Sequence, residues 1–340
     1  MTTRNSYVGL GEVPDGVGAI LRGWDFRCEE EFRDPERLNV IDFRAMTERC
    51  EHNCPGCFAR RKKTISLDQI RSVIDQAAAL GCRGINFNGE GEPTLDEDFW
   101  KIIEHTWRSG IVPILFTAAA KTLCDRDFLY ELYHKGVSVV PKCDSLFNER
   151  YQNKVLGNGA TDYFAERAEA LKALMEREFN DKYSNVTRLG FDMLVTRQNI
   201  HEVPRTLSYC RDRGIWVVFS THLPAGRSAS PEFLFQHRPT PEQMVLMREE
   251  ITRVDRRYVM WRSNQEIPWE HPVYRNFGPY RCVERMQILG DGLVTPCPGN
   301  ETIIGDIRTD SLAELNRRII EQFPCHDPRI FDGNCLYRSS

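Results

Sequence analysis

Three cysteines, Cys50, Cys54 and Cys57, lie within eight residues of one another in the stretch CEHNCPGC. Thiolates at such short spacing are typical ligands of zinc or of an iron–sulfur cluster. Structural zinc sites use four ligands, and the nearest fourth candidate is His52, which lies between the first two cysteines. A 4Fe–4S cluster bound by three cysteines leaves one iron open to a small molecule. The spacing therefore favours a cluster with an open iron over a zinc site.

The elements that position this loop are predicted from hydrophobic periodicity, because short apolar runs alternate with amphipathic stretches from residue 38 to about 225. Strands are expected at 38–43, 83–88, 111–117, 137–143, 188–196 and 215–221. Helices are expected between them, from Leu67 to Gly81 and at 98–109, 126–135, 162–178 and 201–213. This alternation is typical of an α/β fold with a parallel sheet and right-handed crossovers.

Residues suited to ligand binding follow the carboxyl ends of these predicted strands. In parallel sheets the site lies at this edge. The residues concerned are the three-cysteine loop, the segment Asn88 to Pro93, Thr117, Lys142 with Cys143, and the segment Thr221 to Arg227. The sequence therefore predicts one site to which all of them contribute.

The Cys-x3-Cys-x2-Cys spacing after the first strand, followed by GEGEPT (89–94) after the second, resembles the signature of the radical S-adenosylmethionine (radical SAM) superfamily. The resemblance covers about residues 38 to 225. It implies a partial (β/α)6 TIM-like barrel, a 4Fe–4S cluster on Cys50, Cys54 and Cys57, and S-adenosylmethionine as cofactor. An electron from the cluster cleaves this cofactor, and the resulting 5′-deoxyadenosyl radical takes hydrogen from a substrate.

The resemblance also implies which residues contact the cofactor. Glycines of the GEGEP loop let the backbone approach a ligand closely, and Glu92 either accepts hydrogen bonds from the ligand ammonium or holds the loop. Lys142 either meets the ligand carboxylate or is solvated. Family members often carry an aromatic residue before the third cysteine; here Gly56 stands there, so Phe58 or the Gly56 backbone is expected at the adenine. The expected set is Gly56, Phe58, Gly89, Glu90, Gly91, Glu92, Pro93, Thr117, Lys142 and Asp192.

Four more cysteines, Cys282, Cys297, Cys325 and Cys335, lie near the C-terminus. Four thiols suit either zinc or an iron–sulfur cluster. The spacing Cys-x9-Gly-x4-Cys through Gly292 resembles the opening of the SPASM/twitch extension of radical SAM enzymes, and four cysteines imply the shorter twitch form with one auxiliary 4Fe–4S cluster. The spacing of the last two cysteines departs from that form, so whether both are ligands stays open.

The composition limits the class of protein and of partner. A chain of 340 residues with net charge −4 has no basic field for nucleic acid, and it has no apolar run long enough to span a membrane. The N-terminus lacks the apolar region of a signal peptide, so a cytoplasmic protein with reduced thiols is expected. The expected regions are an N-terminal extension (1–37), the barrel (38–235), a linking helix (236–255) and a twitch-type module (256–340) containing a hairpin at 286–297 and a helix at 311–323.

The expected reaction is hydrogen abstraction from a small hydroxylated substrate of sugar or aminocyclitol type, followed by two-electron oxidation with electron transfer to the auxiliary cluster. Three alternatives remain open: a radical epimerase with Cys143 as catalytic hydrogen donor, a ribosomal-peptide-modifying enzyme, and a non-catalytic iron–sulfur scaffold. Cys143 has a competing interpretation as a packed strand-end residue. The run Arg60 to Lys63 is either a solvated loop or the docking site of a flavodoxin or ferredoxin-type electron donor.

Overall fold

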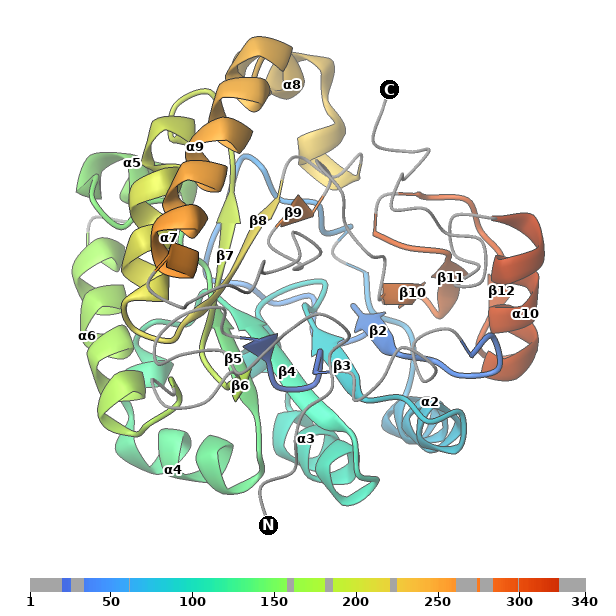
Figure 1. The fold of residues 1–340 in the computed structure, drawn as a ribbon. Coiled ribbons are helices and arrows are strands. Elements are labelled where there is room, and N and C mark those ends of the chain that lie inside the picture. Colours follow the sequence, from blue (N-terminus) through green and yellow to red (C-terminus); the bar gives the residue numbers. More distant parts are fainter. Residues whose placement is uncertain are drawn as a thin grey trace.

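The computed structural model describes residues 20–25, 34–60, 62–157, 162–180, 186–220, 225–260, 274–275, 284–298 and 300–323, without the side chains of 255–260, 274–275 and 284–285. Its centre is a row of parallel strands (Figure 1). These strands are β2 (Val40–Phe43), β3 (Gly84–Phe87), β4 (Val112–Thr117), β5 (Ser138–Pro141), β7 (Gly190–Leu194) and β8 (Trp216–Ser220).

The strands follow one another in chain order. β2 to β5 pair in one sheet, and β7 pairs with β8 in another, which β9 (Tyr274–Arg275) extends. Parallel bridges at Val139–Leu189 and Lys142–Asp192 connect β5 to β7. The two sheets therefore form one curved parallel array, and the predicted α/β fold with a partial barrel is confirmed.

Helices cover the outer face of this array (Figure 1). They are α2 (Leu67–Ala79), α3 (Phe99–Arg108), α4 (Arg126–His134), α5 (Glu149–Val155), α6 (Tyr163–Glu176), α7 (Val203–Arg211) and α9 (Pro241–Met260). The short helix α8 (Pro231–His237) lies beyond the ends of the strands instead. Local sequence sets their starts: Ser66 and Gln69 form the predicted capping box of α2, and Asp125 and Asn148 cap α4 and α5. The two short helices α5 and α8 were not expected from the sequence.

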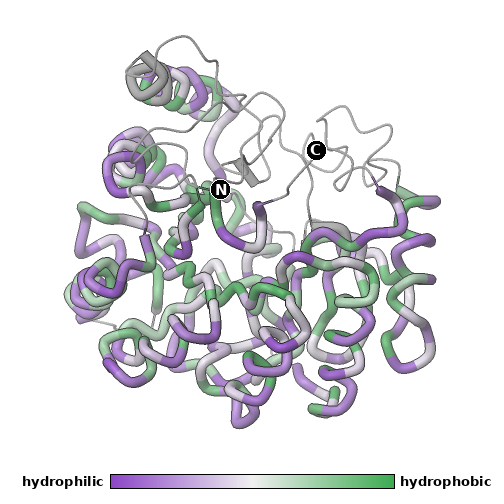
Figure 2. The backbone as a smooth tube through the Cα atoms, turned by 60° about the horizontal axis from the view of Figure 1, so that its bottom comes forward, coloured by the Kyte–Doolittle hydropathy of each residue, from purple (hydrophilic) through white to green (hydrophobic). Residues whose placement is uncertain are grey.

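The core has two parts because side chains of a strand alternate between its faces. Ile41, Leu115 and Val139 pack outward in the cluster that includes the buried faces of the helices. Their neighbours Val40, Ile114 and Val140 pack in a separate cluster inside the barrel. The helices accordingly alternate between hydrophobic and hydrophilic stretches along each coil (Figure 2). None of the helices in the described part of the chain is long and apolar enough to cross a membrane.

A short N-terminal segment closes the inside of the barrel. β1 (Ile20–Leu21) pairs in parallel with β6 (Val186–Thr187). Leu21 and Trp24 belong to the inner cluster, and the Trp24 and Trp216 rings meet edge to face with centroids 5.3 Å apart. Since Trp216 begins β8, this plug fills the amino end of the barrel and leaves the carboxyl end for a site.

The C-terminal part continues the barrel sheet past β2. β10 (Glu284–Ile288) pairs in parallel with β2, and β11 (Leu293–Thr295) and β12 (Gly305–Asp306) follow in antiparallel order. The predicted hairpin is therefore present and joined to the barrel. The boundaries of the predicted module itself stay a prediction.

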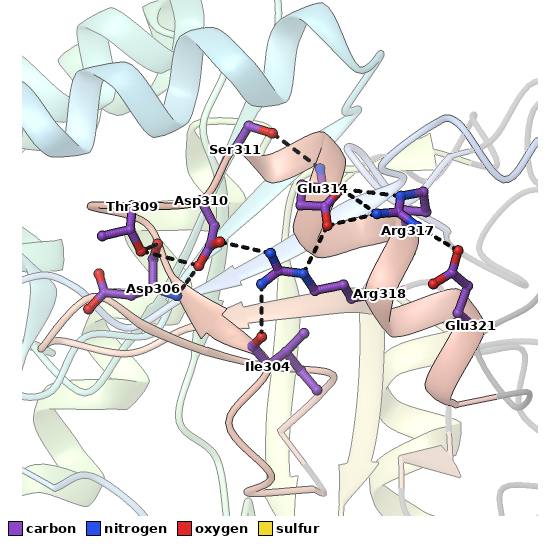
Figure 3. Close-up of polar contacts among 9 residues, drawn as sticks. All are labelled: Ile304, Asp306, Thr309, Asp310, Ser311, Glu314, Arg317, Arg318 and Glu321. Carbon is purple, nitrogen blue, oxygen red and sulfur yellow. Dashed lines mark hydrogen bonds and ion pairs between the residues drawn. The ribbon is translucent and has the colours of Figure 1, made fainter.

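Helix α10 (Leu312–Gln322) is fixed to this hairpin by polar contacts (Figure 3). Arg318 contacts the Asp310 carboxylate at 2.9 Å and the Glu314 carboxylate at 3.0 Å, and it donates to the Ile304 carbonyl at 3.4 Å. Ser311 caps the helix by accepting from the Glu314 amide. The predicted helix at 311–323 is thus present, and one arginine ties it to the segment leading into β12.

Candidate active site

A pocket of about 170 Å³ lies at the carboxyl ends of the barrel strands. All three cysteines of the loop line it, together with residues that follow β3, β4 and β5 and the ends of β7 and β8. The residues predicted from the sequence as cofactor contacts that line it are Gly56, Phe58, Gly91, Glu92, Pro93, Thr117, Lys142 and Asp192. The structure therefore brings eight of the ten predicted contacts to the cysteines.

Several elements brace the three-cysteine loop. Its Asn53 amide donates to the Leu156 carbonyl at the end of α5 at 3.0 Å, and its Cys57 carbonyl accepts from the Arg227 amide at 2.9 Å. The Arg44 guanidinium donates to the Phe58 carbonyl at 3.0 Å. The loop is therefore held from both sides of the barrel mouth.

Two glycines, Gly226 and Gly157, lie where neighbouring segments approach the backbone of the cysteine loop most closely. Gly226 has a φ of +55°, and a Cβ there would lie 2.7 Å from the Phe58 carbonyl carbon and 2.8 Å from the Cys57 carbonyl oxygen. Gly157 has a φ of +67°, and a Cβ there would overlap the Asn53 carbonyl. Glycine is required at both positions, because the backbone is left-handed and a side chain would overlap the cysteine loop.

The side chains of the cysteine loop differ in their suitability as metal ligands. Burial raises the pKa of the Cys54 thiol to about 11, against an opposing attraction to Lys142. The His52 ring nitrogen lies 3.2 Å from the Ala118 carbonyl, and the ring packs edge to face on Tyr163. His52 is therefore engaged with the loop after β4, and three thiols remain the donor set.

Glu92 holds the loop after β3. Its carboxylate accepts from the Thr117 hydroxyl at 2.6 Å, from the Ala118 amide at 2.8 Å and from the Thr94 hydroxyl at 3.0 Å. Burial raises the pKa of Glu92, and these hydrogen bonds oppose that shift. Of the two roles expected for Glu92, this geometry supports the loop-holding one.

The tight glycine of this loop serves the protein rather than a ligand. A Cβ at Gly91 would overlap the Arg49 carbonyl, which accepts from the Glu92 amide at 2.8 Å. The expected close backbone approach at Gly91 is therefore to the segment that precedes Cys50, and it docks the two loops together.

Glu90 and Gly89 are the two predicted cofactor contacts that do not line this pocket. Glu90 forms an ion pair with Arg44 at 3.2 Å with both side chains buried, and it accepts from the Arg60 amide at 2.6 Å. Its carboxylate thus anchors the segment after Cys57. Arg44, which the sequence analysis did not select, stacks on the Phe58 ring at 4.8 Å and is the other half of this anchor.

Lys142 reaches the pocket as expected. Its ammonium lies 3.0 Å from the Asp144 carboxylate. Burial disfavours its charge, but attraction to Asp144 and Asp192 outweighs burial and raises the pKa of Lys142. The lysine is therefore a cation at neutral pH.

Cys143 lies away from the pocket. Its side chain is fully buried and belongs to the outer core cluster with Cys210 of α7. Burial raises the pKa of the Cys143 thiol to about 11. Because successive strand residues face opposite sides, Lys142 points to the pocket and Cys143 to the helices. The thiol lies in the outer core rather than in either pocket, which supports the interpretation of Cys143 as a packed strand-end residue.

A second pocket of about 430 Å³ adjoins the first and shares Cys54, Gly56, Lys142 and Leu194 with it. Polar groups line it, among them Tyr151, whose hydroxyl lies 2.7 Å from that of Thr196. Phe233 of α8 also lines it. A Cβ at Gly56 would lie 2.9 Å from the Phe233 ring, so this ring occupies the space beside the glycine.

The basic run is paired rather than free. Arg60 contacts Glu301 at 2.8 Å, Lys62 contacts Asp291 at 3.3 Å, and Lys63 contacts Asp96 at 2.7 Å. Arg61 lies outside the described residues. Two of these pairs connect the cysteine loop to the C-terminal hairpin.

Of the four late cysteines, Cys297 is described; it is buried and lies just after β11. Cys282, Cys325 and Cys335 lie outside the described residues, as does the start of the predicted 221–227 loop. Within the described ranges, no three His, Cys, Asp or Glu side chains are grouped to hold a single metal ion.

Comparisons with known proteins bear on this geometry. No protein-family model matches the chain. GTP 3′,8-cyclase of Aeromonas hydrophila is 24% identical over 187 residues, which cover 52% of this chain and 51% of the cyclase. Mycofactocin maturase MftC of Mycolicibacterium smegmatis is 25% identical over 210 residues, which cover 58% of this chain and 48% of MftC. The chain thus spans about half the length of the curated relatives it matches.

Solved structures share the fold over a larger part of the chain. anSMEcpe with bound AdoMet (S-adenosylmethionine) has a TM-score of 0.60 at 15% identity, covering 85% of this chain and 83% of that one. Streptococcus suis SuiB bound to its precursor peptide has a TM-score of 0.58 at 15% identity, covering 82% and 64%. These relatives and structural neighbours are radical SAM enzymes, so the chain is similar to that family in sequence over about half its length and in fold over most of it.

The residues of the pocket fit the cofactors that the radical SAM resemblance implies. Cys50, Cys54 and Cys57 line one pocket, and thiolates are the usual ligands of iron–sulfur clusters. Beside them, Lys142 supplies a cation and Thr117 and Asp192 supply polar groups at the pocket wall. These cysteines would hold a 4Fe–4S cluster, and the adjoining pocket residues would hold S-adenosylmethionine.

Proposed function

We propose that this protein is a radical SAM enzyme that oxidises a small hydroxylated molecule of sugar or cyclitol type by two electrons. The observation that carries the proposal is the pair of adjoining pockets, one lined by the three cysteines and one lined by hydroxyl groups together with equal numbers of acidic and basic side chains. A cluster with an open iron, when bound, reduces S-adenosylmethionine and so supplies a radical that takes hydrogen from a substrate C–H bond.

The protein's own residues hold and orient the cofactor in this proposal. Lys142, cationic and fixed by Asp144, would meet the cofactor carboxylate. Leu194 and Phe233 flank Gly56 and provide apolar surface for a flat ring. The plug at the amino end of the barrel excludes water from below, because Trp24 and Trp216 close the inner core.

The second pocket supports the substrate class. A volume of about 430 Å³ is in the range of small-molecule sites. Its charged lining is balanced, with Lys142 and Lys154 against Asp144 and Glu232. Burial and the neighbouring Lys154 lower the pKa of His237, which leaves this ring neutral at pH 7. Tyr151 and Thr196 add hydroxyls, and Phe233 with His237 adds an aromatic surface, which together suit an uncharged polyhydroxylated ring.

Oxidation is favoured over epimerisation by the placement of thiols. An epimerase needs a hydrogen donor beside the substrate, and Cys143 is buried in the outer core. Among the described residues, the thiols that line either pocket are the three predicted cluster ligands. No other thiol there is placed to return a hydrogen atom.

Oxidation also needs one-electron partners. We include in the proposal an auxiliary iron–sulfur cluster on Cys297 with Cys282, Cys325 and Cys335 as the acceptor of the substrate's second electron. A flavodoxin or ferredoxin-type protein is proposed as the external donor for the first cluster.

Peptide modification is the alternative function for a protein of this fold. SuiB is bound to a precursor peptide, and anSMEcpe is bound to a Cp18Cys peptide. The second pocket fits one ring better than an extended peptide. A peptide substrate would have to lie across the outside of this pocket.

The proposal is tested by product analysis in heavy water. Anaerobically reconstituted protein is incubated with S-adenosylmethionine, a flavodoxin system and a panel of neutral cyclitols and hexoses. Oxidation predicts a ketone product, one cofactor consumed per product and no solvent deuterium at the abstracted carbon. One deuterium at that carbon with no ketone would instead establish epimerisation.

A further inference from the structure

A chain of hydrogen bonds runs through the inside of the barrel to the cysteine-lined pocket. The Trp24 indole donates to the Asn86 side-chain oxygen at 3.0 Å, and the Asn86 amide nitrogen donates to Asp42 Oδ1 at 3.0 Å. The Asn88 amide nitrogen donates to the same Asp42 oxygen at 2.9 Å. Asp42 and Asn86 are fully buried, whereas Asn88 lines the pocket.

The chemistry of its members fixes the direction of this chain. An indole N–H only donates, so Asn86 must turn its oxygen to Trp24 and its amide nitrogen to Asp42. A carboxylate oxygen only accepts, so Asn88 must also turn its amide nitrogen to Asp42. The side-chain oxygen of Asn88 is therefore held facing away from Asp42.

The local backbone keeps Asn88 in this place. It follows β3 directly, and its amide donates to the Phe43 carbonyl at 3.2 Å. Asp42 and Asn86 are paired residues of β2 and β3 and face the same side of the sheet. The chain is thus built on two strands of the barrel rather than on a mobile loop.

Two carboxylates line the pocket, Glu92 and Asp192, and both have partners inside the protein. Asp192 accepts from the Ser220 hydroxyl at 3.4 Å and attracts the Lys142 ammonium. The Glu92 carboxylate already accepts from Thr94, Thr117 and Ala118. Lys142 supplies donors only, and so does a ligand ammonium. Asn88, four residues before Glu92, offers an oxygen to which no donor in the described part of the chain is assigned.

We propose that the side-chain oxygen of Asn88 accepts a hydrogen bond from the ammonium group of S-adenosylmethionine, with Asp42, Asn86 and Trp24 as positioning residues. The inference rests on the proposed binding of this cofactor. It adds a contact residue that the sequence motifs do not mark, and it assigns a use to the buried carboxylate of β2.

The test compares two ligands that differ in the amino-acid group. S-adenosylhomocysteine carries the ammonium, and 5′-methylthioadenosine lacks the whole amino-acid portion. Binding of each to the anaerobically reconstituted protein is measured by calorimetry, with iron content and thermal unfolding as controls. Asn88→Ala is expected to weaken S-adenosylhomocysteine binding about tenfold, the effect of one hydrogen bond to a charged group, and to leave 5′-methylthioadenosine binding unchanged.

The positioning role has its own variant. In Asp42→Asn the new amide both donates and accepts, so Asn88 is no longer forced into one orientation. The affinity for S-adenosylhomocysteine is expected to fall severalfold, again without change for 5′-methylthioadenosine. An unchanged affinity in this variant would overturn the positioning role.

The outcomes separate this inference from the function it rests on. A wild-type protein that binds neither ligand overturns the proposed function and this inference together. A wild-type protein that binds both, with Asn88→Ala binding S-adenosylhomocysteine as tightly as wild type, overturns this inference alone. Equal losses for both ligands in Asn88→Ala would show that the residue shapes the pocket without contacting the ammonium.

Discussion

At the scale of single residues, Glu92 shows how a motif residue acts through the protein. Its carboxylate has at least three internal donors on two loops. Glu92→Gln would place an amide nitrogen opposite the Ala118 N–H, so we expect a loss of about 1–3 kcal/mol in the free energy of unfolding. Urea denaturation of the two proteins measures it.

This loss should depend on pH. Because burial raises the pKa of Glu92 above its ordinary value of 4.5, the folded protein binds the proton more tightly than the unfolded chain. The stability from this difference is present below pH 4.5 and is lost as pH rises through the folded pKa. The destabilisation by Glu92→Gln should therefore shrink with rising pH, and a growing difference would contradict the shift.

Cys143 gives a second prediction at this scale. In Cys143→Ser a hydroxyl replaces a buried thiol, which costs about 1–3 kcal/mol in stability if the hydroxyl finds no partner. Turnover per folded, iron-loaded protein should stay at the wild-type value. A variant that cleaves S-adenosylmethionine normally but forms no product would restore Cys143 as a hydrogen donor.

At the scale of elements, the short 3-10 helix η4 (Gly226–Ala229) is expected to set cluster binding. Gly226→Ala would push a methyl group against the carbonyls of Cys57 and Phe58 and displace the three-cysteine loop. We expect a lower iron content after reconstitution and a lower melting temperature.

Gly110→Ala is the matched control for this change. Gly110 also has a positive φ, +79°, but a Cβ there meets no atom within 4 Å. Both variants carry the backbone strain of about 1 kcal/mol, and the steric clash belongs to Gly226 alone. Equal iron content in the two variants would show that η4 does not brace the loop.

The basic run from Arg60 to Lys63 links the cysteine loop to the C-terminal part of the chain through ion pairs. Arg60 and Lys62 pair with Glu301 and Asp291 of the C-terminal hairpin. Replacing both cations by alanine should therefore change turnover equally with flavodoxin and with dithionite. A loss confined to flavodoxin, and reduced by salt, would show that the run also docks the electron donor.

Most elements were predictable because each carried its own periodicity. The six barrel strands lie within two residues of their predicted positions at most ends, since each is a short apolar run between polar segments. The helices α5 and α8 were missed because seven residues do not show two apolar turns. Two-residue strands such as β1 leave no pattern at all.

The sequence predicted site residues well when they belonged to a motif, and less well when their role depends on contacts with distant residues. Cys50, Glu92 and Lys142 line the pocket, as expected from their positions after the predicted strands. The burial of Cys143 follows from the alternation of strand faces, because its neighbour Lys142 faces the pocket. Asn88 was expected at the site, but its contact with Asp42, which lies 46 residues earlier in the chain, could not be seen in the sequence.

At the scale of the whole molecule, the account predicts two clusters per chain. Anaerobic reconstitution should give about eight iron and eight sulfide, four of each per cluster. Replacing Cys50, Cys54 and Cys57 together by alanine should remove about half of both. Four iron together with bound zinc would contradict the auxiliary cluster and leave the barrel site unaffected.

The central claim is that the barrel generates a radical from S-adenosylmethionine at its three-cysteine loop. The most direct measurement is the formation of 5′-deoxyadenosine when reconstituted protein is incubated anaerobically with S-adenosylmethionine and dithionite. The account predicts slow formation without substrate, and none in the variant that lacks the three cysteines. Fully loaded wild-type protein that forms no 5′-deoxyadenosine, or equal formation by the cysteine variant, would contradict it.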